Sequence, residues 1–279
     1  SPTQNLKTKY NASWALVTGA SSGIGRALCF KLASQDLNIV LVALDDQMLS
    51  NTIKDLKIQF PSLQFRAVGV DLGGDPNAYM DKIIKSTTDI QVSIVLNNAG
   101  YLLMGFFRQN AVEKHLANVE CNVLSSVRIT HYFLQHMIQH KIHGCISFTS
   151  SAVWFLPAPF AVLYGAGKAF LSEFAVSLAV EAADHKIDIF CVHPSFTRTN
   201  LYANTPKLSI LSFLDKFGHT PETVADAVVS AIGRTVMLDL GWYAVVTKLA
   251  PRVLDISVLV LLMIPFRKLI PEYKVFSKR

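Results

Sequence analysis

The sequence predicts an α/β fold in which a doubly wound parallel β-sheet carries helices on both faces. Short apolar, β-rich runs alternate with longer amphipathic segments along most of the 279-residue chain. These runs are apolar at successive positions, as in strands that are buried on both faces. Hydrophobic residues make up 51% of the chain and charged residues 16%, which excludes a disordered chain and indicates a large core or additional apolar surface.

The expected elements alternate in chain order. We predict strands at residues 14–18, 39–43, 65–70, 94–97, 145–149 and 187–192. We predict the helices between them at residues 23–33, 46–59, 76–87, 112–140 and 162–185. Because no repeat, low-complexity tract or linker interrupts this series, we expect a single domain over residues 1–279, with its core at about 12–250.

The pattern changes after residue 192. Residues 200–218 are irregular and rich in Leu, Ile and Phe, so we expect this segment to close on something apolar. Thr220 and Pro221 then predict the start of a helix, with Thr220 as the N-cap and Pro221 at the first helical position. This helix is expected to end near Ala231.

An apolar helical extension is predicted over residues 251–279. Its segment 253–266 contains Asp255 and Pro265, so it is too short and too interrupted to span a bilayer. Most of its circumference is apolar, and basic residues flank it. We expect this segment to pack in the core or in an oligomer interface, or to dock on a membrane surface, and the flanking charges favour the membrane.

The charged residues and the cysteines limit the partners and the compartment. The net charge is +6, and basic residues gather at the two ends of the chain. No basic stripe is interleaved with aromatic residues, so we expect no nucleic-acid partner. The cysteines at positions 29, 121, 145 and 191 form no CxxC pair, which predicts buried free thiols in a reducing, intracellular compartment.

No secretory signal is visible at the N-terminus. We therefore expect the cytoplasm or the cytoplasmic face of a membrane, which in a eukaryote would be that of the endoplasmic reticulum. The chain begins with Ser instead of Met, and this leaves an upstream segment, such as a membrane anchor, open.

One short segment carries a pattern suited to acid–base chemistry. Tyr164 and Lys168 are four residues apart in a predicted helix, so they share one face. A free tyrosine has a pKa near ~10, and we expect the nearby ammonium to lower it toward neutral pH. Ser151, thirteen residues upstream of Tyr164, is a hydroxyl that can bind the same oxygen that the tyrosine protonates.

A glycine-rich turn follows the first predicted strand and opens the first predicted helix. Gly19, Gly23 and Gly25 allow a tight turn, a close approach to a pyrophosphate and close helix–strand packing. The N–H groups of the helix N-terminus would then face the anion. In this strand–turn–helix context we predict nucleotide binding by a Rossmann-type sheet.

Taken together, these motifs resemble those of the classical short-chain dehydrogenase/reductase family. The turn is spaced GxxxGxG, and it is followed in the family's order by an NNAG segment at residues 97–100, Asn122, Ser151 and the YxxxK pair. The resemblance runs over residues 14–231. Residues 10–51 look most similar to the membrane-associated 3-oxoacyl-CoA reductases and 17-beta-hydroxysteroid dehydrogenases.

The resemblance implies a role for each matching residue. Tyr164 would exchange the proton, Ser151 would steady the substrate oxygen, and Lys168 would hold the nicotinamide ribose. Asn122 would order a water that links Lys168 to solvent. Ser195 stands where the family's PGxxxT segment has Gly, which puts the conformation of that loop in doubt. The implied cofactor-binding residues are Gly19, Ser21, Ser22, Gly23, Ile24, Gly25, Leu44, Asp71, Leu72, Asn98, Ala99, Gly100, Tyr164, Lys168, Pro194, Thr197 and Thr199.

The end of the second strand bears on the choice of cofactor. An acidic residue there would bind the ribose diol and repel a 2′-phosphate, but the aligned position is Ala43. Leu44 stands where NADPH-using relatives often carry Arg. Ser21, Ser22 and Arg26 are the nearby candidates for a phosphate. NADP(H) is therefore favoured, and NAD(H) is the alternative if Asp45 occupies the ribose site.

The function we predict is NAD(P)H-dependent interconversion of a ketone and a secondary alcohol on a hydrophobic, fatty-acyl or steroid-like substrate. A 3-ketosphinganine or other lipid-ketone reductase is the alternative among enzymes, and a non-catalytic nucleotide-binding regulator or scaffold is the alternative of another class. The intact set of Asn122, Ser151, Tyr164 and Lys168 opposes the scaffold. We also expect a homo-oligomer and peripheral membrane association. No metal site is expected, because no Cys or carboxylate pattern accompanies His131, His136, His140 and His143.

Overall fold

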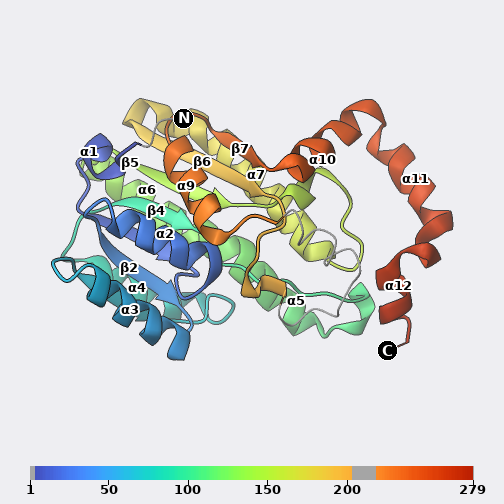
Figure 1. Ribbon diagram of the computed structural model, residues 1–279, viewed down its shortest axis with the longest axis horizontal. Helices are drawn as coiled ribbons and strands as arrows, with labels where there is room; N and C mark the ends of the chain where they lie inside the picture. The colour runs from blue at the N-terminus through green and yellow to red at the C-terminus, as the bar shows by residue number, and fades with distance from the viewer. Residues whose placement is uncertain (1–3, 203–217, 279) are drawn as a thin grey trace.

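A seven-stranded parallel sheet forms the centre of the computed structural model, which describes residues 4–202 and 218–278 (Figure 1). Its strand order is β3-β2-β1-β4-β5-β6-β7, and every neighbouring pair is parallel. The strands are β1 (Trp14–Thr18), β2 (Asn38–Ala43), β3 (Phe65–Gly69), β4 (Val92–Asn97), β5 (Gly144–Thr149), β6 (Ile187–Pro194) and β7 (Met237–Leu240). This confirms the predicted doubly wound parallel sheet, whereas β7 was not predicted.

The chain reverses its direction of winding between β1 and β4. β2 and β3 lie on one side of β1, and β4 to β7 lie on the other. The connections that leave the carboxyl ends of β1 and β4 therefore diverge, and an open α/β sheet binds its ligands at such a point.

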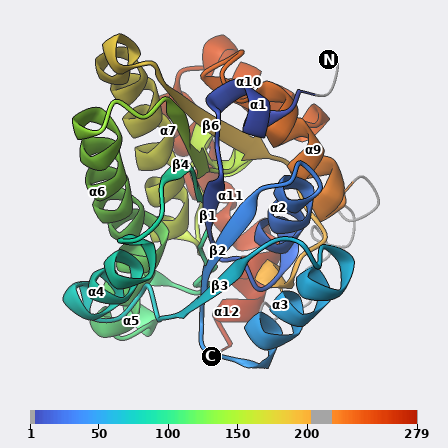
Figure 2. The same cartoon turned by 90° about the vertical axis from the view of Figure 1, so that its left-hand side faces the viewer.

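Helices cover both faces of the sheet (Figure 2). One face carries α1 (Leu6–Tyr10), α2 (Gly23–Ala33), α3 (Gln47–Gln59) and α9 (Pro221–Ala231). The other carries α4 (Pro76–Thr87), α5 (Val112–Val119), α6 (Ser125–Gln139) and α7 (Val162–Ala182). Successive residues of β2 serve the two cores in turn: Ile39 and Leu41 pack in the first, and Val40 and Val42 pack in the second.

The C-terminal extension is helical, as predicted. The helices at this end are α10 (Trp242–Val253), α11 (Ile256–Phe266), a 3-10 turn (Arg267–Leu269) and α12 (Pro271–Phe276), so the helical region begins at Trp242, before the predicted start at residue 251. Figure 1 shows these helices at one end of the molecule, with α11 at the outer edge. Among the described residues no single helix is long and apolar enough to cross a membrane. Trp242–Pro251 and Ile256–Leu269 reach that length only as a pair bent by 104°.

Two predicted helices end differently in the structure. The helix predicted at residues 112–140 is divided by a π-helical turn at Glu120–Leu124, which separates α5 from α6. The helix predicted to reach residue 185 ends at Ala182, because a 3-10 turn follows and Lys186 then adopts a left-handed conformation with φ of 56°. The helix α9 begins as predicted, since the Thr220 side chain accepts a hydrogen bond from the Thr223 N–H. The predicted apolar segment 200–218 lies largely outside the described residues.

Candidate active site

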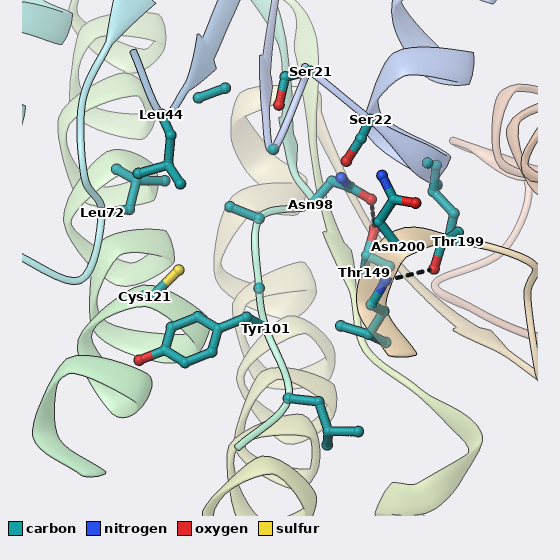
Figure 3. A pocket seen from close by; sticks show the side chains of 18 of the residues that line it. Ser21, Ser22, Leu44, Leu72, Asn98, Tyr101, Cys121, Thr149, Thr199 and Asn200 are labelled. Carbon is teal, nitrogen blue, oxygen red and sulfur yellow. Dashed lines mark hydrogen bonds between the residues drawn. The ribbon is translucent and has the colours of Figure 1, made fainter. Parts of the chain in front are cut away.

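A cavity of about 600 Å³ opens at the carboxyl ends of the strands (Figure 3). Nearly all residues that we predicted to bind the cofactor or to act in catalysis line this cavity. Gly25 and Asn122 do not line it. The predicted residues in its lining are Gly19, Ser21, Ser22, Gly23, Ile24, Leu44, Asp71, Leu72, Asn98, Ala99, Gly100, Ser151, Tyr164, Lys168, Pro194, Thr197 and Thr199.

The glycine-rich turn has the shape that a dinucleotide needs. Gly19 and Gly23 have φ values of +64° and +52°, which L side chains rarely adopt. A Cβ on Gly19 would lie 2.9 Å from Ala99 Cα, so the turn packs directly against the chain after β4. Ser22, the N-cap of α2, makes no side-chain capping bond to any described residue. The first N–H groups of α2 are thus open to an anion, and a dinucleotide fits.

Gly25 acts in packing and not in lining the cavity. A Cβ at this position would collide with the Gly19 carbonyl oxygen and crowd the Asn98 side chain. Its small size therefore allows α2 to approach the end of β1, which is the third role foreseen for the glycines.

Asn98 ties three strands together beneath the cavity. The Thr18 hydroxyl oxygen accepts hydrogen bonds from the Asn98 and Ala99 N–H groups, both at 2.9 Å. The Asn98 side chain donates to the Thr18 carbonyl at 3.2 Å and accepts from the Thr149 hydroxyl at 3.2 Å (Figure 3). These bonds fix the carboxyl ends of β1, β4 and β5 relative to one another.

Tyr164, Ser151 and Lys168 meet at one end of the cavity. Tyr164 and Lys168 lie one turn apart on α7 and are buried, with exposed fractions of 9% and 3%. Ser151 follows β5 in an extended conformation, and its hydroxyl lies close enough to the Tyr164 hydroxyl to lower the pKa of the phenol. The three groups that the sequence selected therefore form one cluster.

The pKa of Tyr164 moves opposite to the prediction. Burial raises it to about 12, and the Ser151 hydroxyl only partly opposes this. The Lys168 ammonium is bonded elsewhere: its Nζ donates to the Thr149 carbonyl at 2.7 Å and lies 5.4 Å from the centre of the Tyr164 ring. Burial also lowers the pKa of Lys168 to about 8.

Asn122 lies in the π-helical turn, just behind the cavity wall. Its Nδ2 donates to the carbonyl oxygens of Tyr101 at 3.0 Å and Asn118 at 2.9 Å, while its buried Oδ1 has no partner among the described residues. A Cβ placed on Gly100 would overlap this Oδ1 and lie 3.6 Å from Lys168 Nζ. The unpaired acceptor and the ammonium therefore border the same small space.

The loop after β6 keeps its place despite the unusual Ser195. The Ser195 N–H donates to the Leu240 carbonyl at 2.9 Å, and its hydroxyl accepts from the Ala244 N–H at 3.2 Å. Ser195 thereby fastens the loop to the start of α10, and Thr197 and Thr199 remain in the cavity lining. The Ser195 hydroxyl thus gives this loop a contact that glycine lacks.

At the end of the cavity expected to hold the adenosine, Asp45 does not take the place of the acidic residue that is absent at position 43. Asp45 lies against Gly69, where a Cβ on the glycine would be 2.7 Å from Asp45 Cβ, and it does not line the cavity. Leu44 lines the cavity and is 55% exposed. Arg26, a candidate for a phosphate, instead forms an ion pair with Asp55 at 2.8 Å.

A buried polar network supports α7 from behind. His193 is fully buried at the end of β6, with its Nδ1 2.7 Å from an Asp239 oxygen and its Nε2 3.0 Å from the Ser172 hydroxyl. The Ser172 and Ser150 hydroxyls each donate to the Lys168 carbonyl, at 2.8 and 2.7 Å. Lys248 pairs with the other Asp239 oxygen.

Several lining residues escaped the sequence analysis, among them Tyr101, Leu102, Thr149, Asn200 and Cys121. Most adjoin a predicted motif, so extending each motif by one or two residues would have found them. Cys121 lies beside Asn122 and is partly exposed, which corrects the prediction of a buried thiol. In residues 4–202 and 218–278, no group of three or more His, Cys, Asp or Glu is placed to hold a metal ion.

The family profile of the short chain dehydrogenases matches residues 13–208, well over half of the chain. The chain is a short-chain dehydrogenase. The dehydrogenase is 30% identical over 223 residues to a very-long-chain 3-oxoacyl-CoA reductase of Pyricularia oryzae, which covers 76% of this chain and 67% of the relative. It is 26% identical over 237 residues to a 7beta-hydroxysteroid dehydrogenase of Mediterraneibacter gnavus, covering 85% and 88%. Both matches agree with the predicted subgroup and confirm an oxidoreductase.

Solved structures share the fold of the dehydrogenase. A 7beta-hydroxysteroid dehydrogenase superposes with a TM-score of 0.80 at 22% identity, over 89% of this chain and 95% of that one. A short-chain dehydrogenase of Sphingobium yanoikuyae, in complex with NADPH, gives 0.73 at 26% identity over 82% and 87%. A family member of Burkholderia phymatum, in complex with NAD, gives 0.76 at 21% identity over 89% and 95%.

Proposed function

We propose that this short-chain dehydrogenase reduces a hydrophobic ketone to a secondary alcohol, with Tyr164 as the proton donor. The observation that carries this proposal is the cluster of Ser151, Tyr164 and Lys168 in the same cavity as the glycine-rich turn. A cofactor whose phosphates lie at the turn would extend toward this cluster. A scaffold has no physical need for such a cluster.

The roles follow from where each group lies. NADPH, when bound, supplies the hydride that is added to the carbonyl carbon. Ser151 donates a hydrogen bond to the substrate oxygen, and Tyr164 transfers its proton to that oxygen as the hydride adds. Because burial raises the pKa of Tyr164 to about 12, the phenol carries its proton at neutral pH and is ready to act as an acid.

Lys168 and Asn122 support this transfer. The buried Lys168 ammonium is placed to bind the ribose hydroxyls of the cofactor. The unpaired Asn122 Oδ1 beside it is what a buried water needs as a partner, and such a water would return a proton toward the site from solvent.

The preference for NADPH rests on the end of β2. Ala43 lines the cavity and brings no carboxylate that would repel a 2′-phosphate, and Asp45 is turned against Gly69. The Asp46 carboxylate also lines the cavity, but it caps α3 by accepting a hydrogen bond from the Leu49 N–H at 3.0 Å. Ser21 and Ser22 are the hydroxyl groups placed to bind the phosphate. The NADPH-bound neighbour supports this choice, and the NAD-bound one keeps NADH as the alternative.

The substrate is proposed to be a fatty-acyl or steroid-like ketone. Tyr101, Leu102 and Leu201 line the same cavity and favour an apolar ligand. The names of the relatives, a 3-oxoacyl-CoA reductase and a hydroxysteroid dehydrogenase, point to the same two classes. A 3-ketosphinganine or another lipid ketone would suit the same surface.

The test is consumption of NADPH by the purified protein. Fatty β-ketoacyl thioesters, steroid ketones and small polar ketones should be compared, with Tyr164→Phe as the inactive control. We expect turnover with at least one of the two lipid classes and little with the polar ketones. NADPH binding without turnover of any ketone would favour a regulator, and preference for polar ketones would contradict the substrate class.

A further inference from the structure

The last helices form an arch that is fastened to the body at its start. We call residues 242–278 the C-terminal arch. The inner side of α10 is buried at Ala244 and Thr247. The Ala244 N–H donates to the Ser195 hydroxyl at 3.2 Å, and the Thr247 hydroxyl, which donates to the Tyr243 carbonyl at 2.8 Å, lies 3.4 Å from the Ala152 carbonyl. Both partners adjoin site residues, because Ser195 lines the cavity and Ala152 follows Ser151.

The arch is fastened again at its far end. The Phe276 carbonyl on α12 accepts a hydrogen bond from Gln109 Nε2 at 3.2 Å. The Tyr273 ring packs edge-on against Phe106 with centroids 5.4 Å apart, and the Phe276 ring stacks on Phe160 at 5.9 Å. Phe106 and Gln109 belong to the loop that continues from the cavity wall. The two ends of the arch thus rest on two different segments that adjoin residues of the cavity lining.

Between these anchors, α11 carries large apolar side chains that nothing described covers. None of its described residues is buried. Ile256, Leu261, Leu262, Ile264 and Phe266 are 47%, 67%, 54%, 51% and 59% exposed. At about 100° per residue these positions point in several directions around the helix. A protein partner covers one side of a helix, whereas acyl chains cover all of its sides, so this distribution favours lipid.

The charges next to α11 indicate which lipid. Arg267, Lys268 and Lys274 are exposed and follow the helix closely, while Glu272 is the acidic residue among them. Such a cationic cluster beside an apolar helix complements an anionic headgroup surface. The same side chains would repel one another across a symmetric contact with a second copy.

The length of α11 limits how it can meet a bilayer. Its 11 residues extend about 16 Å, roughly half of the ~30 Å hydrocarbon thickness. We propose that the C-terminal arch docks on an anionic lipid bilayer, with α11 lying among the acyl chains just below the headgroups. The cavity lining that adjoins the arch then lies beside the membrane surface. This docking stands whether or not the proposed reaction is correct.

The experiment is co-sedimentation of the full chain with vesicles. Vesicles of phosphatidylcholine alone are compared with vesicles that contain about one third phosphatidylserine. We expect binding to the anionic vesicles that weakens as salt is added. The double variant Leu261→Asp with Ile264→Asp should lower the partition coefficient by at least about tenfold, because two carboxylates replace apolar groups that the acyl chains would bury. Arg267→Glu with Lys268→Glu should remove the preference for anionic vesicles.

A matched control separates this surface from general stickiness. Ile58 on α3 is 70% exposed, close to the 67% of Leu261, but it lies outside the C-terminal arch. Ile58→Asp should therefore leave vesicle binding unchanged. NADPH binding by each variant, followed by protein fluorescence, verifies that it is folded. The proposal is wrong if the wild type ignores anionic vesicles or if the folded Leu261→Asp, Ile264→Asp variant binds them equally well. A drop in mass by light scattering for that variant, without vesicle binding by the wild type, would assign the surface to a second copy.

Discussion

Replacing His193 with Ala tests whether the buried network behind α7 holds the catalytic helix. The imidazole lies 2.7 Å from Asp239 and 3.0 Å from Ser172, and the rings of Trp154 and Phe155 pack against it. The substitution removes one hydrogen bond to a carboxylate, worth about 1.5–3 kcal/mol, and one to a neutral hydroxyl, worth about 1 kcal/mol. The cavity that the imidazole leaves beside the two rings adds to this loss.

These contributions amount to a loss of roughly 4 kcal/mol in the free energy of unfolding. Lys248 remains paired with Asp239 in the variant, so the substitution leaves no buried carboxylate unpaired. For a chain of this size, a loss of about 4 kcal/mol lowers the melting temperature by roughly 8–16 °C. Thermal denaturation followed by circular dichroism measures the shift.

If His193 positions the catalytic helix α7, its loss should lower kcat as well as the melting temperature. Without His193, Ser172 loses one of the contacts that fix it against the Lys168 carbonyl. We expect kcat to fall by about tenfold with little change in the KM of the ketone, since small displacements of catalytic groups act on the reaction step. His193→Gln keeps a donor for Asp239 and a polar atom for Ser172, so it should restore much of kcat.

His115→Ala is the control for loss of a buried imidazole elsewhere. His115 bonds the Phe107 carbonyl at 2.8 Å and stacks on that ring, away from the network. It should lower the melting temperature while kcat changes less than in His193→Ala. A shift below about 3 °C for His193→Ala, together with an unchanged kcat, would refute the reasoning.

The other predictions concern the cavity itself. Tyr164→Phe should lower kcat by about 10²–10⁴-fold while NADPH titration by fluorescence shows unchanged affinity, and activity within about tenfold of wild type would exclude Tyr164 as the donor. Reduction should slow as pH rises through about 8, where Lys168, whose pKa burial lowers to about 8, loses its charge; a pH profile of kcat flat across that range would contradict this. Ala43→Asp should shift preference from NADPH toward NADH in paired titrations. Gly100→Ala should cost about 10² in kcat, because the new Cβ overlaps Asn122 Oδ1.

The fold was predictable wherever a local pattern was strong. Strands such as β1 are buried at every position and apolar at all but the last, and Thr220 with Pro221 marks a helix start by side-chain chemistry alone. β7 escaped because it is four residues long, half-buried at the edge of the sheet, and interrupted by Asp239. The contact that explains Asp239 comes from His193, 46 residues earlier, and no local pattern reveals such a pairing.

The residues that form the site were more predictable from the sequence than the pKa values of their side chains. Spacing alone placed Tyr164 and Lys168 on one helical face, and the glycine pattern placed the turn. The direction of the Tyr164 pKa depends on burial and on the preference of Lys168 for the Thr149 carbonyl, which are tertiary properties. Asn122 was identified by its order in the motif, but its position behind Gly100 requires the π-helical turn.

That turn has a consequence for how this helix tolerates insertions and deletions. A π-helical turn holds one residue more than an α-helical path, and one residue corresponds to about 100° of rotation. Deleting a residue between Glu120 and Leu124 would make α5 and α6 continuous and rotate one against the other. Either Asn122 would leave its place behind Gly100, or the buried face of α6 at Ile129 and Phe133 would turn away from the sheet. The extra residue thus allows Asn122 and the buried face of α6 each to point in the direction that its contacts require. An insertion or deletion here is tolerated only if a second change restores the rotation of α6 relative to α5.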